Sequence, residues 1–303
     1  MSNQFERIFI MNLQRISNLP PLPPRPVDSH KGTFGKVLVI AGSSGMSGAA
    51  CLSGMGALRG GAGLVFLAVP QEIQSIVATV NPCYLTLPLH VEPSGQLTGP
   101  SAKFLLPQIY DSAAIAIGPG LGKLPWVQML IWKLYAEFEQ PLIIDADALN
   151  VIAESDQSLP AAAGPRIFTP HPGEFARLTG KSIAQIGEDR EAAAVEYARQ
   201  QQIILLLKGA DTLITDGTSI AVNTTGNSGM STGGTGDVLT GLLTALCGQG
   251  ISPFAAAQLA AHLHGLAGDL AAEDLSQPAL IASDLLDYLP DAWLQLQSQT
   301  ENE

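Results

Sequence analysis

The sequence predicts an α/β protein with a mostly parallel central sheet and helices on both faces. From Lys36 onward, short apolar runs alternate with longer stretches of helical periodicity, which is the pattern of strands and helices that follow one another in turn. Several apolar runs contain no polar residue, which favours parallel strands buried on both faces. Hydrophobic residues make up 46% of the 303 residues, enough to fill one large core.

The predicted strands are short and mostly apolar. They are Val37–Ala41, Leu64–Val69, Tyr84–Leu87, Ala113–Ile117, Leu142–Ile144, Ile167–Phe168, Ile203–Leu207, Thr212–Thr215 and Ile220–Val222. The predicted helices lie between or after them, at Ser47–Arg59, Ile73–Val80, Pro125–Phe138, Ile183–Gln201, Asp237–Cys247 and Pro253–Leu270. Ligands of open α/β sheets bind at the carboxyl ends of the strands, so residues that follow strands are the functional candidates.

A single domain is predicted between two tails. Residues 1–27 include the proline-rich stretch Pro20–Pro26, which favours extended polyproline geometry. We expect a flexible tail there, either a plain linker or a docking motif. Residues 28–290 show no internal repeat and no break in composition, and residues 291–303 turn polar and are expected to fray.

Composition excludes two classes of partner and indicates a compartment. With 27 acidic residues against 15 lysines and arginines, the net charge is −12, and we find no basic patch for nucleic acid. An acidic surface repels anionic membranes, and no signal peptide or membrane-spanning apolar run is found. Cys51, Cys83 and Cys247 are scattered, which is typical of reduced thiols in the cytoplasm.

The glycine-rich stretch Asn227–Asp237 carries the strongest functional pattern. It leads into a predicted helix, and the N–H groups of residues 234–237 could form an anion hole for a transferring phosphoryl group. Asp237 could accept a proton from a substrate hydroxyl, or it could simply cap the helix. The stretch is not a P-loop, because no G-K-[ST] follows.

Two other segments follow predicted strands. Lys208–Thr212 presents a lysine beside a glycine, which suits a phosphate contact, although an ordinary turn explains it as well. In Thr169–Glu174 two prolines hold the backbone rigid around His171. Glu174 could hold a hydrated Mg²⁺ beside nucleotide phosphates, or it could be a first-turn helix carboxylate.

The remaining segments carry weaker signals. Gly118–Gly122 would let the backbone pass close to a flat ligand, and Asp145 directly follows an apolar strand. The helix that Ala41–Ala50 enters is rich in small residues, which favours tight packing on backbone or ligand. His262 and His264 are two residues apart and do not share a helix face, which argues against a metal site.

Taken in order, these segments resemble the ADP/ATP-dependent NAD(P)H-hydrate dehydratases, a family with the ribokinase-like fold. The matching stretches are H-K-G-x-x-G-K-V, G-P-G-L-G, D-A-D-A-L-N, T-P-H-P-G-E, L-K-G-A-D-T and G-N-S-G-M-S-T-G-G-T-G-D-V-L. Each is modest by itself, but their combination in this order is specific. The resemblance implies phosphorylation of the C6 hydroxyl of S-NADHX or S-NADPHX, followed by loss of phosphate. It also implies ADP as the donor in the bacterial branch, and Mg²⁺.

The resemblance also assigns the site residues. It implies contacts with the hydrated cofactor for Ala49 (or its neighbour Ala50), Gly120, His171 and Asp237, with Asp237 as the base. For the adenine nucleotide it implies Lys208, Gly209, Ala210, Asp211, Thr212, Gly233, Gly234, Thr235 and Gly236. Glu174 is the expected metal ligand, although the wider fold class often carries N-x-x-E where this chain has His171 and Glu174.

Partners are implied in the same way. Many relatives carry an epimerase domain before the dehydratase, for which residues 1–27 are too short. The R epimer would then need a separate epimerase, which we expect as a partner, or spontaneous epimerisation. Relatives are often homotetramers. Two rival functions remain: a small-molecule kinase of the same fold, acting on a vitamin precursor or sugar, and a nucleotide-sensing protein without turnover. Release of a phosphorylated product would identify the kinase, and an acid at Asp237 is needless for binding alone.

Overall fold

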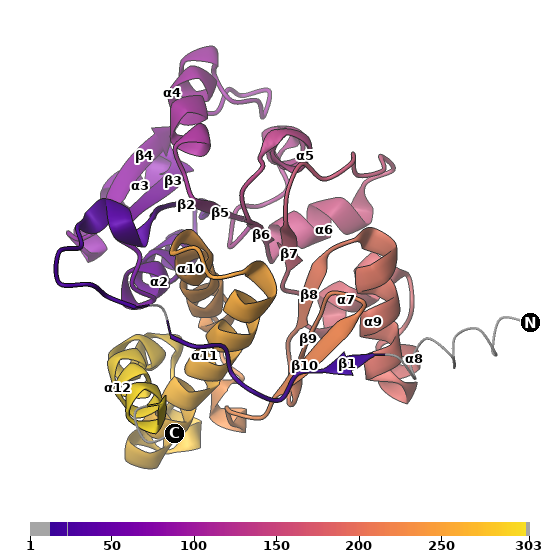
Figure 1. Cartoon of the computed structure of the whole chain (residues 1–303). Coiled ribbons are helices and arrows are strands. Elements are labelled where there is room, and N and C mark those ends of the chain that lie inside the picture. Colours follow the sequence, from indigo (N-terminus) through magenta and orange to yellow (C-terminus); the bar gives the residue numbers. More distant parts are fainter. Residues whose placement is uncertain (1–12, 23, 301–303) are drawn as a thin grey trace, which may run out of the picture.

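A single twisted sheet forms the centre of the computed structural model, which describes residues 13–22 and 24–300 (Figure 1). Its strands are β1 Gln14–Arg15, β2 Lys36–Ile40, β3 Leu64–Pro70, β4 Leu85–Leu89, β5 Ala114–Ile117, β6 Leu142–Ile144, β7 Arg166–Phe168, β8 Ile204–Leu207, β9 Thr212–Thr215 and β10 Ser219–Asn223. Among the described residues the sheet has 10 strands in the order β1-β10-β9-β8-β7-β6-β5-β2-β3-β4. Only the β8–β9 and β9–β10 pairings are antiparallel.

Helices cover both faces of the sheet (Figure 1). They are α2 Ser47–Arg59, α3 Gln71–Val80, α4 Gly99–Tyr110, α5 Pro125–Glu137, α6 Asp147–Glu154, α7 Pro172–Thr179, α8 Ile183–Glu188, α9 Arg190–Gln201, α10 Thr235–Gly248, α11 Pro253–Leu275 and α12 Ala282–Thr300. Short 3-10 turns lie at Lys31–Phe34, Ser228–Met230 and Gln277–Ala279. One core cluster joins the sheet to α2, α3 and α10 to α12, and a second joins it to α4 through α9. The predicted fold class is confirmed.

Strand β2 shows why the apolar runs become buried strands. Val37 and Val39 point into one core cluster, and Leu38 and Ile40 point into the other. Side chains alternate across a strand, so a strand covered on both sides needs apolar residues at every position.

No helix within the described ranges has both the length and the apolar character that a membrane span requires.

Some helices escaped the sequence prediction or were joined. Helices α4, α6, α7 and α12 were not predicted, and the expected helix over Ile183–Gln201 is two helices. The break falls at Asp189, whose φ of −151° and ψ of 83° are not helical. Its side chain accepts a hydrogen bond from the Ala192 N–H, as an N-cap does. A new helix therefore starts at Arg190.

The described part of the predicted N-terminal tail packs against the body. Residues 1–12 and 23 lie outside the description. Gln14 and Arg15 pair in parallel with β10 and extend the sheet at its edge (Figure 1). Farther along, the Gln258 side chain donates to the Asn18 carbonyl oxygen and Arg25 donates to the Gly61 carbonyl oxygen. The segment is extended, as its prolines require, but these contacts hold it in place.

The expected fraying at the C-terminus also differs from the structure. Helix α12 continues to Thr300, and only residues 301–303 lie outside the description. Leu289, Ala292 and Leu296 are buried against the core. Their spacing places them on one helix face, so burial of that face holds a segment whose composition is polar. The overall division into one domain and two tails stays a prediction.

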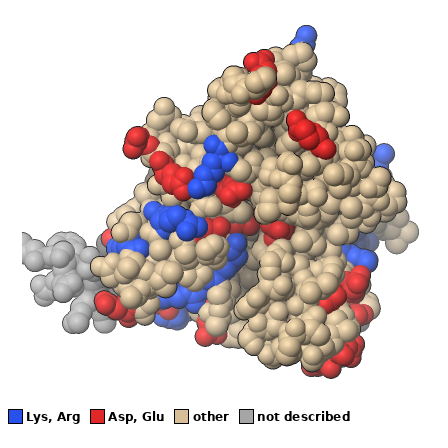
Figure 2. Space-filling view, turned by 180° about the vertical axis from the view of Figure 1, so that it is seen from behind, with Lys and Arg blue, Asp and Glu red and all other residues tan. Residues whose placement is uncertain are grey.

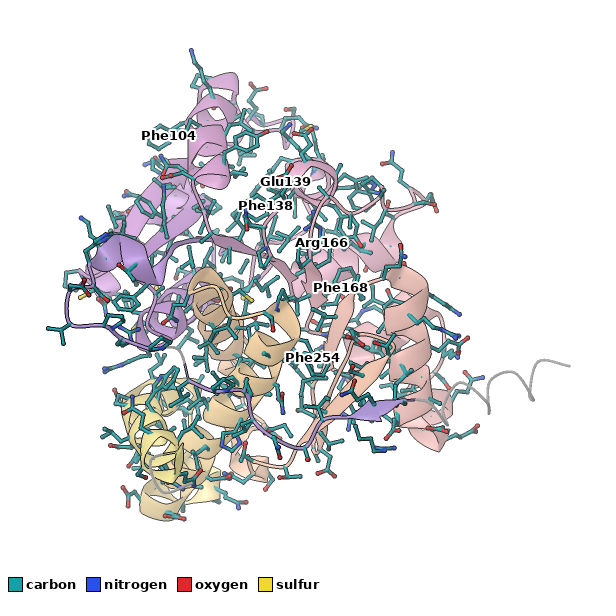
Figure 3. The ribbon with its side chains drawn as sticks, in the orientation of Figure 1. Phe104, Phe138, Glu139, Arg166, Phe168 and Phe254 are labelled. Carbon is teal, nitrogen blue, oxygen red and sulfur yellow. The ribbon has the colours of Figure 1, made fainter. Side chains whose placement is uncertain are left out.

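A buried arginine joins α5 to the sheet. Arg166 lies between Phe138 and Phe168 in Figure 3. Its guanidinium donates to the carbonyl oxygens of Leu134, Tyr135 and Phe138 at 3.2, 2.6 and 2.7 Å. Helix ends leave such carbonyls without partners in the helix. Burial lowers the pKa of Arg166 to about 10. Because this value is still well above neutral pH, the side chain stays charged.

Helix α10 packs on α2 with almost no space between the backbones. A Cβ atom at Gly241 would lie only 1.9 Å from the Ser53 carbonyl oxygen, and one at Gly56 would lie 2.4 Å from the Val238 carbonyl oxygen. Only glycine allows this approach. Because α10 begins beside the site described below, the contact fixes where its first turn lies.

Replacing Gly241 by alanine should destabilise the protein by about 1–3 kcal/mol, because the methyl group overpacks a closed contact. Urea unfolding would measure the change. The control is Gly48→Ala in the first turn of α2, where a Cβ meets nothing within 4 Å. That change should be neutral or stabilising by up to about 1 kcal/mol. Equal stability of the Gly241→Ala protein and the wild type would contradict the tight contact.

Candidate active site

A cavity of about 770 Å³ opens at the carboxyl ends of β6, β7 and β8, beside the first turn of α10. Seen from behind the view of Figure 1, the middle of the molecule is hollowed, and acidic and basic groups meet there (Figure 2). Of the predicted site residues, the cavity is lined by His171, Glu174, Lys208, Gly209, Ala210, Asp211, Thr212, Gly234, Thr235, Gly236 and Asp237. Segments far apart in the sequence thus meet in one place.

An ion pair crosses the floor of the cavity. The Lys208 Nζ donates to Asp145 Oδ1 at 2.9 Å, and the Thr240 hydroxyl donates to Asp145 Oδ2 at 2.6 Å. Asp145 is 1% exposed. Burial by itself lowers the pKa of Lys208, but the carboxylates of Asp145 and Glu174 outweigh it and hold that pKa above its usual value. The lysine is therefore a fixed positive charge.

His171 and Glu174 form a capping box at the start of α7. The His171 Nδ1 accepts from the Gly173 N–H at 2.9 Å, while the His171 N–H donates to Glu174 Oε2 at 2.8 Å. Burial, with Lys208 and Arg177 nearby, lowers the pKa of His171, so the ring is neutral and carries its hydrogen on Nε2. Burial also raises the pKa of Glu174. One of the two prolines, Pro172, is the first residue of α7, and the predicted rigidity of this unit stays a prediction.

Asp237 lies in the first turn of α10 and lines the same cavity. Within the described residues no group donates a hydrogen bond to its carboxylate. Burial and then the charge of Asp145 raise the pKa of Asp237 to about 7, although Lys208 acts in the opposite direction. A carboxylate with such a pKa can take a proton from a hydroxyl near neutral pH.

The backbone of the predicted anion hole differs in one detail. Gly234, with φ of 96°, reverses the chain before α10. The Asp237 N–H already donates to the Gly234 carbonyl oxygen at 3.0 Å. Within the described part of the chain, the N–H groups of Gly234, Thr235 and Gly236 have no backbone acceptor. The available donors are therefore these three, and the fourth predicted N–H is already bonded.

Ala49, Gly120 and Gly233 do not line the cavity. Ala49 and Gly120 are nevertheless brought together, because a Cβ at Gly120 would lie 2.9 Å from the Ala49 Cβ. The Ser43 hydroxyl donates to the Gly120 carbonyl oxygen at 2.7 Å. These two distant segments therefore lie in contact, and the predicted roles of Ala49 and Gly120 toward a ligand stay predictions.

The far wall of the cavity was missed by sequence reasoning. It is formed by residues 223–226, at and after the end of β10, and by three residues of α11, namely Ala261, His264 and Gly265. The buried His264 is neutral, since burial lowers its pKa to about 4, and its Nε2 lies 2.9 Å from the Thr235 carbonyl oxygen. Helical histidines of this kind give no sequence signal, although the N-T-T-G stretch following a strand does.

The side chains at the cavity do not form a cluster that could coordinate a metal ion directly, within the described residues. Within the described ranges, no group of three or more His, Cys, Asp and Glu side chains could hold a metal ion. Both Asp145 oxygens are occupied by Lys208 and Thr240. Glu174, the predicted ligand, also lines the cavity, and one carboxylate suits an ion that keeps most of its water.

Comparisons with known proteins match this chain to one family. The family model described as NAD(P)H-hydrate dehydratase matches residues 37–291. The bifunctional NAD(P)H-hydrate repair enzyme Nnr of Moorella thermoacetica is 45% identical over 92% of this chain and 53% of its own. The ADP-dependent (S)-NAD(P)H-hydrate dehydratase of Bacillus subtilis is 37% identical over 90% of this chain and 94% of its own.

A solved structure has the same fold. The ADP/ATP-dependent NAD(P)H-hydrate dehydratase of Bacillus subtilis, co-crystallised with ATP and Mg²⁺, superimposes with a TM-score of 0.77 at 33% identity, covering 90% of this chain and 94% of that one. The chain spans about half the length of the first bifunctional relatives that it matches, at 52 to 54%.

Asp237→Asn should change the pH dependence of stability. The folded protein binds the Asp237 proton more tightly than the unfolded chain does, so this contribution to stability falls as pH rises from 3.8 to about 7. The variant has no carboxyl group at this position and does not lose this stability. The difference between its melting temperature and that of the wild type should therefore increase between pH 5 and 8. Thermal melts across that range measure it. Asp156→Asn, on an exposed loop, is the control, and a constant difference at Asp237 would contradict the expectation.

Proposed function

Because the chain belongs to the NAD(P)H-hydrate dehydratase family, we propose that it uses ADP to dehydrate (6S)-NADHX and (6S)-NADPHX, with release of AMP and phosphate. One observation carries the proposal. The Asp237 carboxyl group, with its pKa raised to about 7, lies in the same cavity as the loop Lys208–Thr212. A base and a nucleotide-binding loop in one cavity are what phosphoryl transfer to a hydroxyl needs.

The first step is transfer of the terminal phosphoryl group of ADP. The C6 hydroxyl oxygen forms a bond to the β-phosphorus, the bond from that phosphorus to the bridging oxygen breaks, and AMP leaves. Asp237 takes the hydroxyl proton. The N–H groups at the start of α10 and the positive charge of Lys208 stabilise the negative charge on the transferring group.

The second step is elimination. Phosphate leaves C6 as the electron pair of the ring nitrogen moves toward that carbon, and loss of a proton from C5 completes the double bond. Phosphate is a far better leaving group than hydroxide, which is why the nucleotide is needed. The same backbone N–H groups can stabilise phosphate as it arrives and as it leaves.

Mg²⁺ fits as an ion bound mainly by the nucleotide. When bound, it would neutralise phosphate charge. Glu174 is the cavity carboxylate that could hold it, through water molecules, because its Oε2 already accepts the His171 N–H. His171 would bind the hydrated cofactor with its Nε2–H. Ala49 and Gly120 would contact the same ligand from the adjoining segment.

The compartment, the partner, the assembly and an alternative function complete the proposal. Free thiols at Cys51, Cys83 and Cys247 support a reducing compartment, the cytoplasm. The separate epimerase partner and the homotetramer stay predictions. A kinase of the same fold, acting on a vitamin precursor or sugar, is the alternative function. It would release a phosphorylated product because no nitrogen adjacent to the phosphorylated carbon would drive elimination.

Given ADP, Mg²⁺ and S-NADHX, the protein should form NADH, AMP and phosphate in equal amounts. NADH absorbance would follow the reaction, and chromatography would measure the nucleotides. ATP should serve poorly if the similarity to the bacterial branch holds. A stable phosphorylated product, or no gain in absorbance with either nucleotide, would overturn the dehydratase function in favour of the kinase.

Asp237→Asn should lower kcat by about 10²–10⁴-fold, the usual contribution of a general base. ADP affinity, measured by calorimetry, should change little, because the amide keeps the size of the side chain. Asp156→Asn again provides the control. Turnover of the Asp237→Asn protein near the wild-type rate would remove Asp237 from the catalytic role.

A further inference from the structure

Arg190 stands at the start of α9, outside the residues that line the cavity. Its side chain nevertheless reaches the loop between β8 and β9. One guanidinium nitrogen donates to the carbonyl oxygens of Leu207 and Lys208 at 2.9 and 3.1 Å. The other donates to those of Ala210 and Asp211 at 2.7 and 3.1 Å. A single side chain therefore binds the carbonyl group of the last β8 residue and three carbonyl groups of the loop.

The loop has its carbonyl groups bonded and its N–H groups unbonded. The fifth carbonyl, that of Gly209, accepts the Thr212 hydroxyl at 2.8 Å. In contrast, the N–H groups of Gly209, Ala210 and Asp211 donate to no acceptor among residues 13–22 and 24–300, and all three residues line the cavity. A run of unpaired N–H groups at a cavity is a binding site for an anionic or acceptor-rich ligand.

The backbone of this loop includes a strained residue, which the surrounding contacts must hold in place. Asp211 has a φ of 51°, in the left-handed region that costs a residue with a side chain free energy. Gly209 has a φ of 138°, and a Cβ there would lie 3.2 Å from a guanidinium nitrogen of Arg190. The glycine thus makes room for the arginine, and the arginine holds the strained turn.

Arg190 also supplies charge. Burial lowers the pKa of Arg190 and the charge of Asp211 raises it, but a guanidinium group stays ionised at neutral pH. This charge contacts the loop in a protein of net charge −12. Bonds from a cation to the carbonyl oxygens polarise the peptide groups, which strengthens the N–H groups as donors toward a ligand.

We propose that Arg190 is a positioning residue for the adenine nucleotide. It fixes the loop Lys208–Thr212 so that the N–H groups of that loop face the ligand, and it touches no ligand atom itself. The identity of the ligand as an adenine nucleotide rests on the function proposed above. The geometry of the loop is independent of that function.

The test compares Arg190→Met with the wild type. Calorimetry should show ADP and AMP binding weakened about 10–100-fold, as expected when hydrogen bonds from a charged group are lost. The KM for ADP should rise by a similar factor, while the KM for the hydrated cofactor stays near wild type. Arg190→Lys, which keeps the charge but loses the fork, should fall between the two.

Chemical rescue separates positioning from general stability. Guanidinium chloride at low millimolar concentration should restore much of the ADP affinity of Arg190→Ala, and sodium chloride at the same ionic strength should not. Val77→Ala, in the buried face of α3 far from the cavity, is the destabilised control. Arg59→Met, at an exposed arginine, is the charge control. Both should keep wild-type ADP affinity.

Wild-type ADP affinity in Arg190→Met would overturn the proposal. So would an equal loss of affinity in Val77→Ala, because the effect would then reflect stability alone. The dehydration reaction is assayed separately with the wild-type protein. Binding of ADP without dehydration would overturn the proposed function and leave the role of Arg190 standing. Dehydration by the wild type, together with wild-type ADP affinity in Arg190→Met, would support the proposed function and overturn the role of Arg190.

Discussion

The ion pair between Lys208 and Asp145 joins the three elements from which the site is built. Asp145 follows β6, Lys208 follows β8, and Thr240 of α10 donates to the second carboxylate oxygen of Asp145. A buried charge that loses its partner costs about 3–5 kcal/mol. The two strand ends and the helix are therefore held at fixed positions relative to one another, and Asp237 is placed one turn from Thr240 on the same helix.

The same pair sets the balance of charge in the cavity. The carboxylate of Asp145 raises the pKa of Asp237, and Lys208 lowers it, with burial as the larger cause. Without the lysine, several carboxylates would share one low-dielectric space and repel any phosphate. With it, one fixed positive charge lies beside Gly236, where a Cβ atom would be 3.3 Å from the Lys208 Nζ. An acidic protein can therefore bind anions through a local arrangement.

The sequence was most informative where burial is uniform. Strands buried on both faces must be apolar throughout, so β2, β5 and β8 could be recognised from composition. Of the candidates that follow these three strands, those after β8 line the cavity, and those after β2 and β5 do not. Helix α12 was missed although Leu289, Ala292 and Leu296 have helical spacing, because the segment as a whole is polar. Pairing of β1 with β10 depends on residues about two hundred positions apart, which no local pattern records.

Arg190 shows the deeper limit of sequence reasoning. Its partners are carbonyl groups 17 to 21 residues away, and every residue has a carbonyl group, so no partner residue type marks the contact. The adjacent Gly209 did stand out, and a glycine beside a lysine suggested close approach of a ligand. The structure gives that glycine a second reason, because its missing side chain admits the guanidinium. Gly234 similarly reverses the chain before α10 and lies against Leu52, whose Cδ1 would be 2.5 Å from a Cβ there. Glycines in this site therefore serve the packing that shapes the backbone, and the ligand meets the N–H groups which that packing leaves unpaired.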